Sequence, residues 1–553
     1  MPDFRDLTDV LVHPRYDVAI RDLVAKWPFR TFVDILMVVD TEISTDPASD
    51  FGIASVIAEL RATKIGCMRF RVDIALRSPG AQGVNASPTP TQPKYTGFRF
   101  DMAVGGTPVI DKYEQIWCFG FKPSNSGSPN DAEIDQAFAM PASNAELNAL
   151  DGWMTNKKGG LFGTGDHHFL GASMCRKIPR LGTMRRWTNA DGVPPIGTPA
   201  RIDTLRPPSA AFEPGAPNQQ VLGNGPHQGD LKVQPIRWVP DASHFHTVFT
   251  IHRRPHPVLC HPSLGPIDVM PDHAHEGLCV PSPDLNANKK FKAEKEYPDA
   301  VGGGDKPKPK VIAFGSNLGQ PPYLFAKGSQ PARTDNPMIA VYDGHKAGVG
   351  RVATDSTWHH WMDVNIDVIR AADTTDWKKI KRYYQNLAVW LNPPGYSTHC
   401  FFHAVIASHF ETVGFQEYSR AATVAELGVA LRGHLHWHYG PCWVSERIWD
   451  VLVDLEFIPK RFPFPEIEER FPELALDSAL LETAILGELV KATFDQADQV
   501  REAVDADRPK RVRPLPAPQE LFAKPVRAGL DTFLAETKRR CGDANGVVGK
   551  LFA

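Results

Sequence analysis

The sequence lacks the features that mark membrane and secreted proteins. It contains no run of about 18 apolar residues, so no membrane-spanning helix is expected. The opening segment, MPDFRDLTDVLVHPRYD, carries charges throughout and has no apolar core of the kind that a secretory signal needs. We therefore expect a soluble, cytoplasmic protein without a membrane partner.

An excess of charge of one sign is also absent. The chain has 61 Lys and Arg against 64 Asp and Glu, which leaves a formal net charge of -3. Because nucleic-acid and anionic membrane surfaces attract strongly basic proteins, this balance gives no reason to expect a nucleic-acid partner.

Cysteines are few, and none of them lies close to another in the sequence. The eight cysteines contain no C-x-x-C pair, which argues against a zinc ribbon and against a dense disulfide framework. We expect most of them to be reduced and buried, as small hydrophobic residues are.

What is present is typical of a globular protein of more than one domain. The 553 residues are 42% hydrophobic and 23% charged. Apolar runs predict strands at Phe32–Ser44, Gly66–Leu76, Tyr113–Phe121 and Gly160–Gly163. Helices are predicted between them, one of them starting with a capping box of Ser143 and Glu146. This alternation favours an α/β fold with a doubly wound, mostly parallel, flavodoxin-like sheet.

The rest of the chain suggests insertions and a helical end. Polar, Pro- and Gly-rich stretches predict long insertions at about residues 188–235 and 281–310, the second as an exposed loop. A hairpin turning at DGHKAG is predicted in PMIAVYDGHKAGVGRVATDS. We expect one α/β domain over residues 1–395 and a mostly helical region over residues 396–553.

Three histidine-rich segments stand out. The first, GGLFGTGDHHFLG, lies at a predicted strand-to-helix turn and contains Asp166, His167 and His168. The second, DHAHE, contains Asp272, His273, His275 and Glu276. The third, STWHHW, contains His359 and His360. In α/β sheets ligands bind beyond the carboxyl ends of the strands, so the first segment is a candidate site.

The element order, the GGLFGTGDHH turn and the segment GRVATDSTWHH together resemble the class I glutamine amidotransferase-like superfamily, particularly its trehalose-utilisation (ThuA-like) branch. The resemblance covers about residues 30–395. It implies a catalytic-position histidine in the last segment. The family's nucleophilic cysteine is missing, since the turn holds Thr164, Gly165 and Asp166, and thiol-based amide hydrolysis is therefore not expected at this turn.

Three interpretations of the histidine clusters stay open at this point. One is a divalent metal site, with zinc as an example, whose ligands are His168, Asp272, His273 and His275. Another is a metal-free acid–base site, in which the catalytic residues are Asp166, His167, Glu276, His359 and His360. The third is structural hydrogen bonding without catalysis.

The functional hypothesis is a hydrolase that acts on a small polar substrate. Thr164, Arg185 and Arg186 are the candidate substrate-binding residues, the arginines because a guanidinium holds a carboxylate or phosphate with two hydrogen bonds. The alternative is a non-catalytic binding or scaffold protein that kept the fold after the cysteine was lost. The sequence leaves the substrate and the oligomeric state open, a homo-oligomer included.

Overall fold

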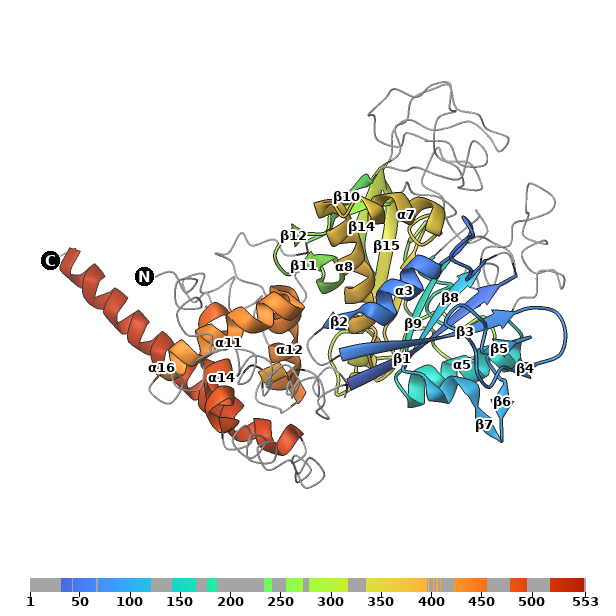
Figure 1. The fold of residues 1–553 in the computed structure, drawn as a ribbon. Helices are drawn as coiled ribbons and strands as arrows, with labels where there is room; N and C mark the ends of the chain where they lie inside the picture. Colours follow the sequence, from blue (N-terminus) through green and yellow to red (C-terminus); the bar gives the residue numbers. More distant parts are fainter. Residues whose placement is uncertain are drawn as a thin grey trace, which may run out of the picture.

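The computed structural model describes most of the α/β part and four C-terminal helices (Figure 1). The described residues are 31–41, 43–65, 68–120, 142–165, 177–185, 233–240, 255–271, 278–316, 335–394, 396, 401, 404–405, 408, 422–454, 478–494 and 518–551.

A large sheet forms the centre of the α/β part. Its middle is parallel, in the spatial order β3 (Met68–Arg77), β1 (Thr31–Asp40), β8 (Gln115–Gly120), β9 (Gly160–Gly165) and β16 (Val352–Asp355). The strands predicted at Phe32–Ser44, Tyr113–Phe121 and Gly160–Gly163 are found as β1, β8 and β9, which are adjacent and parallel.

Antiparallel strands extend the sheet on both sides. Beyond β16 lie β15 (Asp335–Tyr342), β14 (Lys310–Ser316), β10 (Gln234–Trp238) and β13 (Val269–Met270). Beyond β3 lie β5 (Tyr95–Thr96), which is still parallel, and β4 (Gly83–Val84), while β2 (Lys64–Ile65) pairs with the start of β3. The predicted hairpin is confirmed as β15 and β16, joined through the short 3-10 helix Gly344–Ala347.

Helices cover both faces of the sheet, as a doubly wound fold requires (Figure 1). On one face α3 (Ala54–Ala62), α7 (Asp363–Ala371) and α8 (Thr375–Trp390) bury their apolar sides in one large core. On the other face α5 (Asn144–Asn156) packs over a second core. The predicted capping box is present: Ser143 Oγ accepts from the Glu146 amide, and the Glu146 carboxylate accepts from the Ser143 amide.

The polar stretch 281–310 is a loop with many exposed residues, as predicted, but part of it is anchored to the domain. Two of its lysines contact Asp151 of α5, which is buried, with Lys289 Nζ at 2.7 Å and Lys292 Nζ at 2.6 Å. Arg180 Nη2 lies 3.3 Å from the other oxygen of the same carboxylate. Burial opposes ionisation, but these cations hold the pKa of Asp151 below its ordinary value. The segment is therefore anchored to α5 by a buried charge cluster, with Tyr297 fully buried beside it.

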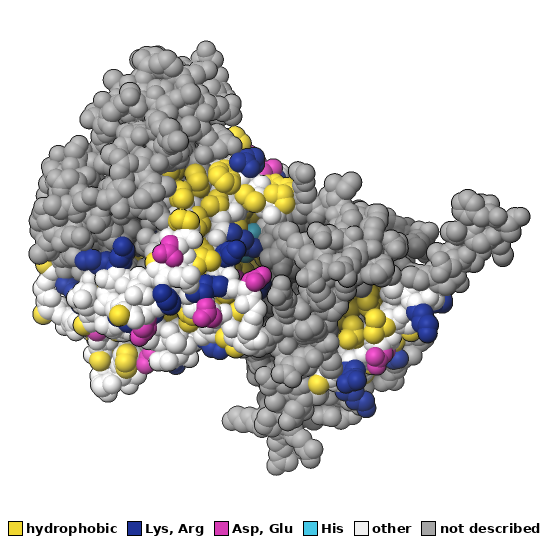
Figure 2. Space-filling model, turned by 180° about the vertical axis from the view of Figure 1, so that it is seen from behind, with side chains coloured by type: hydrophobic (Ala, Val, Ile, Leu, Met, Phe, Trp, Pro, Cys, Tyr) yellow, Lys and Arg dark blue, Asp and Glu magenta, His cyan; other side chains and the backbone are white. Residues whose placement is uncertain are grey.

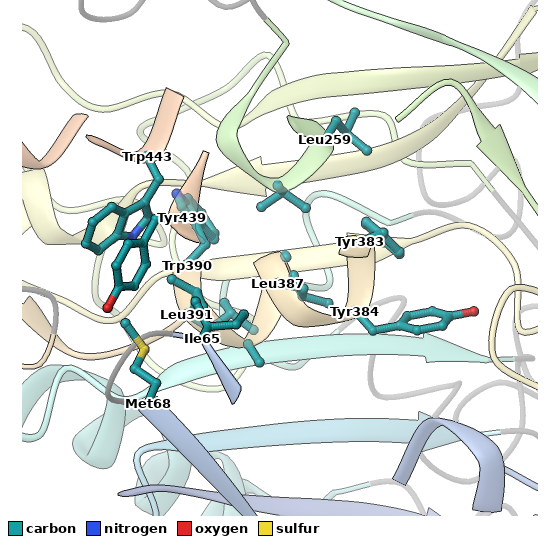
Figure 3. Close-up of a cluster of buried hydrophobic side chains, with 14 of the residues drawn as sticks. Ile65, Met68, Leu259, Tyr383, Tyr384, Leu387, Trp390, Leu391, Tyr439 and Trp443 are labelled. Atoms are coloured by element: carbon teal, nitrogen blue, oxygen red, sulfur yellow. The ribbon is translucent and has the colours of Figure 1, made fainter. Parts of the chain in front are cut away.

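The expected C-terminal helical region is present. It consists of α11 (Val424–Tyr439), α12 (Pro441–Asp454), α14 (Ser478–Ala492) and the long α16 (Pro518–Leu551). Figure 3 shows how the apolar cluster around α8 continues from Met68 of the sheet to Tyr439 and Trp443 of α11 and α12. The domain boundary after residue 395 stays a prediction.

The mixed surface charge agrees with the small net charge of the sequence, and the described cysteines are buried as expected. On the face in Figure 2, Lys and Arg are interspersed with Asp and Glu among the described residues. None of the described helices is long and apolar enough to cross a membrane. Cys118, Cys260 and Cys279 are buried, as expected of core cysteines.

Close approach of α11 and α14 depends on glycine. A Cβ at Gly428 of α11 would overlap the backbone oxygen of Thr483, and one at Gly487 of α14 would overlap that of Val424. A Cβ at Gly433, also in α11, would meet nothing within 4 Å.

We therefore expect Gly428→Ala to destabilise the protein by about 1–3 kcal/mol, because the two helices must move apart. Gly433→Ala, the matched control, should stabilise it by up to about 1 kcal/mol through helix propensity. Urea unfolding followed by circular dichroism measures both. Equal effects of the two substitutions would contradict the close-packing argument.

Candidate functional site at the carboxyl edge of the sheet

Buried polar side chains gather where the parallel strands end. Asp40 and Arg77 end β1 and β3 side by side, and Thr164 and Asp355 lie at the ends of β9 and β16. All four are at most 1% exposed. Because apolar residues normally fill such positions, this row of polar groups marks the strand ends as the candidate site.

The centre of the site is a carboxylate–imidazole pair. Asp355 Oδ2 lies 2.7 Å from His360 Nδ1, and both side chains are fully buried. Tyr383 of α8 donates its hydroxyl to the same oxygen at 3.2 Å, and the Thr357 amide donates to Oδ1 at 3.2 Å. Burial, with the Asp355 charge, raises the pKa of Tyr383 well above its ordinary value, so the phenol stays a donor.

This arrangement fixes the imidazole. Because a carboxylate only accepts hydrogen bonds, Nδ1 of His360 carries a proton, and in the neutral ring Nε2 is then the basic nitrogen. Nε2 is buried and has no hydrogen-bond partner among the residues that the structure describes. A ring held in this way can take up or release a proton at Nε2.

The loop that carries His360 is fastened at several points. Thr164 Oγ1 donates to the Thr357 carbonyl at 2.9 Å, and the Tyr384 hydroxyl donates to the His360 carbonyl at 2.6 Å. His359 takes a different position from its neighbour: its ring stacks on Trp358, with centroids 3.6 Å apart, and its Nδ1 lies 3.4 Å from Asn365 Oδ1.

Arg185 joins the ends of β9 and β16. Its guanidinium donates to the carbonyls of Gly165, of Asp355 at 3.1 Å and of Ser356 at 3.4 Å, and the side chain is fully buried. Gly165 itself has a φ of 136°, and a Cβ there would overlap the backbone of Gly120, so the turn needs glycine. The binding of a substrate anion by Arg185 stays a prediction.

A second carboxylate ties the other end of the loop to α3. Asp363 accepts from the Ala54 amide at 2.9 Å and from the Ser55 amide at 2.8 Å, so it caps a helix whose own N-cap residue, Ile53, provides no side-chain bond. Burial first, and then the charge of Asp367, raise the pKa of Asp363 to about 6, against the effect of the two amides.

Four of the twelve predicted site residues can be compared with the structure. Thr164, Arg185, His359 and His360 meet within the strand-end cluster. The residues that lie outside the described ones are Asp166, His167, His168, Arg186, Asp272, His273, His275 and Glu276. In the part of the chain that the structure describes, no group of three or more His, Cys, Asp or Glu could hold a metal ion.

Sequence reasoning missed two members of the cluster. Asp355 precedes His360 by five residues in ATDSTWHH, and an acid so close to a histidine pair was a usable signal. Tyr383 lies among the buried residues of α8, and nothing in its local sequence connects it to Asp355.

Comparisons with protein-family models, curated proteins and solved structures found no match to this chain.

Arg185 offers a direct test of the strand-end cluster. Replacement by Met removes a donor from several buried carbonyls, each of which costs about 1–3 kcal/mol when left unpaired. We expect Arg185→Met to lower the free energy of unfolding by on the order of 3 kcal/mol, measured by chemical denaturation. Arg71→Met is the control, because the Arg71–Asp34 pair lies at the surface and contributes at most about 1 kcal/mol. Similar losses in the two variants would contradict the role of Arg185.

Asp363 makes stability depend on pH. Its folded-state pKa of about 6 lies above the unfolded value of ~3.9, so between these values the folded state binds more protons and stability falls as pH rises. A shift of this size corresponds to on the order of 2–3 kcal/mol. Asp363→Asn should remove that decrease, measured as the denaturation midpoint from pH 4 to 7, whereas Asp376→Asn should keep it. The assignment would be refuted if the midpoint of Asp363→Asn changed with pH in the same way as the midpoints of the wild type and of Asp376→Asn.

Proposed function

We propose that this protein is a hydrolase in which the Asp355–His360 pair is the general acid–base at the carboxyl edge of the sheet. The observation that carries the proposal is the 2.7 Å contact of Asp355 with His360 Nδ1, which leaves Nε2 as a buried nitrogen without a partner among the described residues. Enzymes use a carboxylate in this way to set the tautomer of a catalytic imidazole and to stabilise its protonated form.

The order of the parallel strands supports a flavodoxin-like, amidotransferase-like fold, and the pair lies at the end of one of these strands. Counting the longer parallel strands in chain order, their spatial order is second, first, third, fourth and fifth, which is the flavodoxin-like order. The pair follows the fifth strand, and the turn where the family has its nucleophile follows the fourth, β9. The segment GRVATDSTWHH therefore occupies the place that the family resemblance assigns to a catalytic histidine.

The residues suggest a simple proton sequence. His360 Nε2 accepts a proton from water as the water oxygen attacks the electrophilic carbon of the substrate, and the bond to the leaving group breaks as Nε2 returns the proton to that group. The Asp355 carboxylate holds Nδ1 throughout and accepts a further hydrogen bond from the Tyr383 hydroxyl. Asp166, His167, Glu276 and a zinc-like ion on His168, Asp272, His273 and His275 stay proposed additions to this site.

A second candidate is favoured by one specific observation. The side chains of Asp355, His360 and Arg185 are all 0% exposed, which is also what a purely structural hydrogen-bond network would show. In this alternative the chain is a binding or scaffold protein, and the pair only holds the β16 loop in place.

The two candidates differ in the effect of small substitutions. We expect Asp355→Asn and His360→Gln each to lower kcat by about 10²- to 10⁴-fold, the contribution of general acid–base catalysis. His359→Gln should cost less, because its ring faces Trp358 and Asn365. The assay is turnover of a panel of chromogenic small esters and amides, with the unfolding midpoint of each variant measured in parallel.

The outcomes separate the candidates. A fall in kcat that exceeds any fall in the population of folded protein supports the hydrolase. Full turnover in a folded His360→Gln variant refutes the catalytic role. No turnover of any panel substrate by the wild type, together with lower stability in both variants of the pair, favours the structural alternative.

A further inference from the structure

Arg382 of α8 is a buried cation whose hydrogen-bond partners are neutral. The residue is only 9% exposed; its Nε donates to Asn386 Oδ1 at 2.8 Å, and its Nη2 donates to the His438 carbonyl at 2.9 Å. Burial lowers the pKa of Arg382 to about 10, and none of the described Asp or Glu residues counteracts this effect. Because buried charges in proteins are normally paired with an opposite charge, this position favours an anionic ligand.

A histidine lies beside this arginine. The hairpin of β11 (Cys260–His261) and β12 (Gly265–Pro266) packs against α8 (Figure 1). Asn386 Nδ2 holds the hairpin by donating to the Cys260 carbonyl at 2.9 Å. Since the oxygen of the same Asn386 amide accepts from the guanidinium, the next residue of the hairpin, His261, lies next to the buried cation.

His261 presents a hydrogen-bond donor. Its Nδ1 accepts from the amides of Ser263 at 3.2 Å and Leu264 at 3.0 Å, so in the neutral ring the proton is on Nε2. Burial first, and then the charges of Arg382 and Lys379, lower the pKa of His261 to about 4, so the ring is neutral at neutral pH. Within the described ranges, neither His261 Nε2 nor Arg382 Nη1 has a hydrogen-bond partner, and neither atom is sealed from solvent.

A lysine completes the group. Lys379 lies one helical turn before Arg382 on α8, and its Nζ is 2.7 Å from Asp268 Oδ1. Asp268 offsets the charge of Lys379, so the excess positive charge of the group lies on the guanidinium. A guanidinium binds two oxygens of an oxyanion at once, and donors from three side chains suit the oxygens of a phosphate better than the two of a carboxylate. We propose that Arg382, His261 and Lys379 bind the phosphate group of a small solute.

The structural alternative is that Arg382 only caps α11. The His438 carbonyl lies at the C-terminal end of that helix, where partial negative charge favours a cation. In that case the guanidinium stabilises the fold, and phosphate leaves the unfolding midpoint unchanged. The proposal requires in addition that phosphate bind the folded chain and raise this midpoint.

Titration calorimetry of the full chain tests the proposal, with inorganic phosphate and glycerol phosphate as the probes. We expect Arg382→Met to weaken the binding of phosphate by at least about 10-fold, because a hydrogen bond to a charged group is worth that much. Lys381→Met is the matched control, because Lys381 is the preceding residue of α8 but its Nζ lies 2.8 Å from Glu59 of α3. Binding should persist in that variant. The probe that binds more tightly shows whether the site takes the free anion or the phosphate group of an organic molecule, and binding of either supports the proposal.

A second measurement uses the wild type alone, so it does not depend on the folding of a variant. Bound phosphate offsets the charges that lower the pKa of His261, and we expect that pKa to rise from about 4 toward its ordinary value, measured by NMR of isotope-labelled histidine.

Three results overturn the proposal. The first is the lack of saturable binding of either probe to the wild type up to about 10 mM. The second is equal weakening in Arg382→Met and Lys381→Met, which would indicate general attraction to a basic surface. The third is a His261 pKa that saturating phosphate leaves unchanged.

Discussion

The parallel pairing of β16 with β9 is the constraint on which the rest of the candidate site depends. It brings Thr164 and Thr357, which are 193 residues apart in the chain, into hydrogen-bond contact. Only with this register does Asp355 reach the carboxyl edge beside Gly165, where Arg185 can bind the carbonyls of both strand ends. The Asp355–His360 pair, the loop behind it and the cap on α3 all follow from that one strand pairing.

Burial of charge recurs wherever segments distant in sequence meet. Asp151 fastens the 281–310 segment through lysines, and Arg77 binds Glu146 between the end of β3 and the start of α5. Asp363 links α7 to α3. An isolated buried charge costs several kcal/mol, so each of these contacts favours a single partner arrangement over alternatives. Apolar packing alone would be less selective about which loop lies against which helix.

The sequence predicted those parts of the fold that are decided locally. Continuous apolar runs identify β1, β8 and β9, and a capping box identifies the start of α5. The sequence prediction failed where the environment of a side chain depends on a partner far away in the chain. Lys289 looks like a solvent-exposed lysine in its own segment, because nothing there reveals that Asp151, 138 residues away, neutralises it. The same reason hid Tyr383, whose hydroxyl has a partner only after β16 and α8 are packed together. His360, by contrast, was identified from its cluster and from the family resemblance.

The central claim is that His360 Nε2 is a working proton acceptor and not a packed core atom. A crystal structure of the full chain at near-atomic resolution, with a small polar substrate analogue in the crystallisation solution, tests it most directly. The account predicts an ordered water or analogue oxygen about 2.6–3.2 Å from Nε2, the distance that proton transfer requires. Apolar side chains packed against Nε2, with no polar atom in reach and no path to solvent, would contradict it.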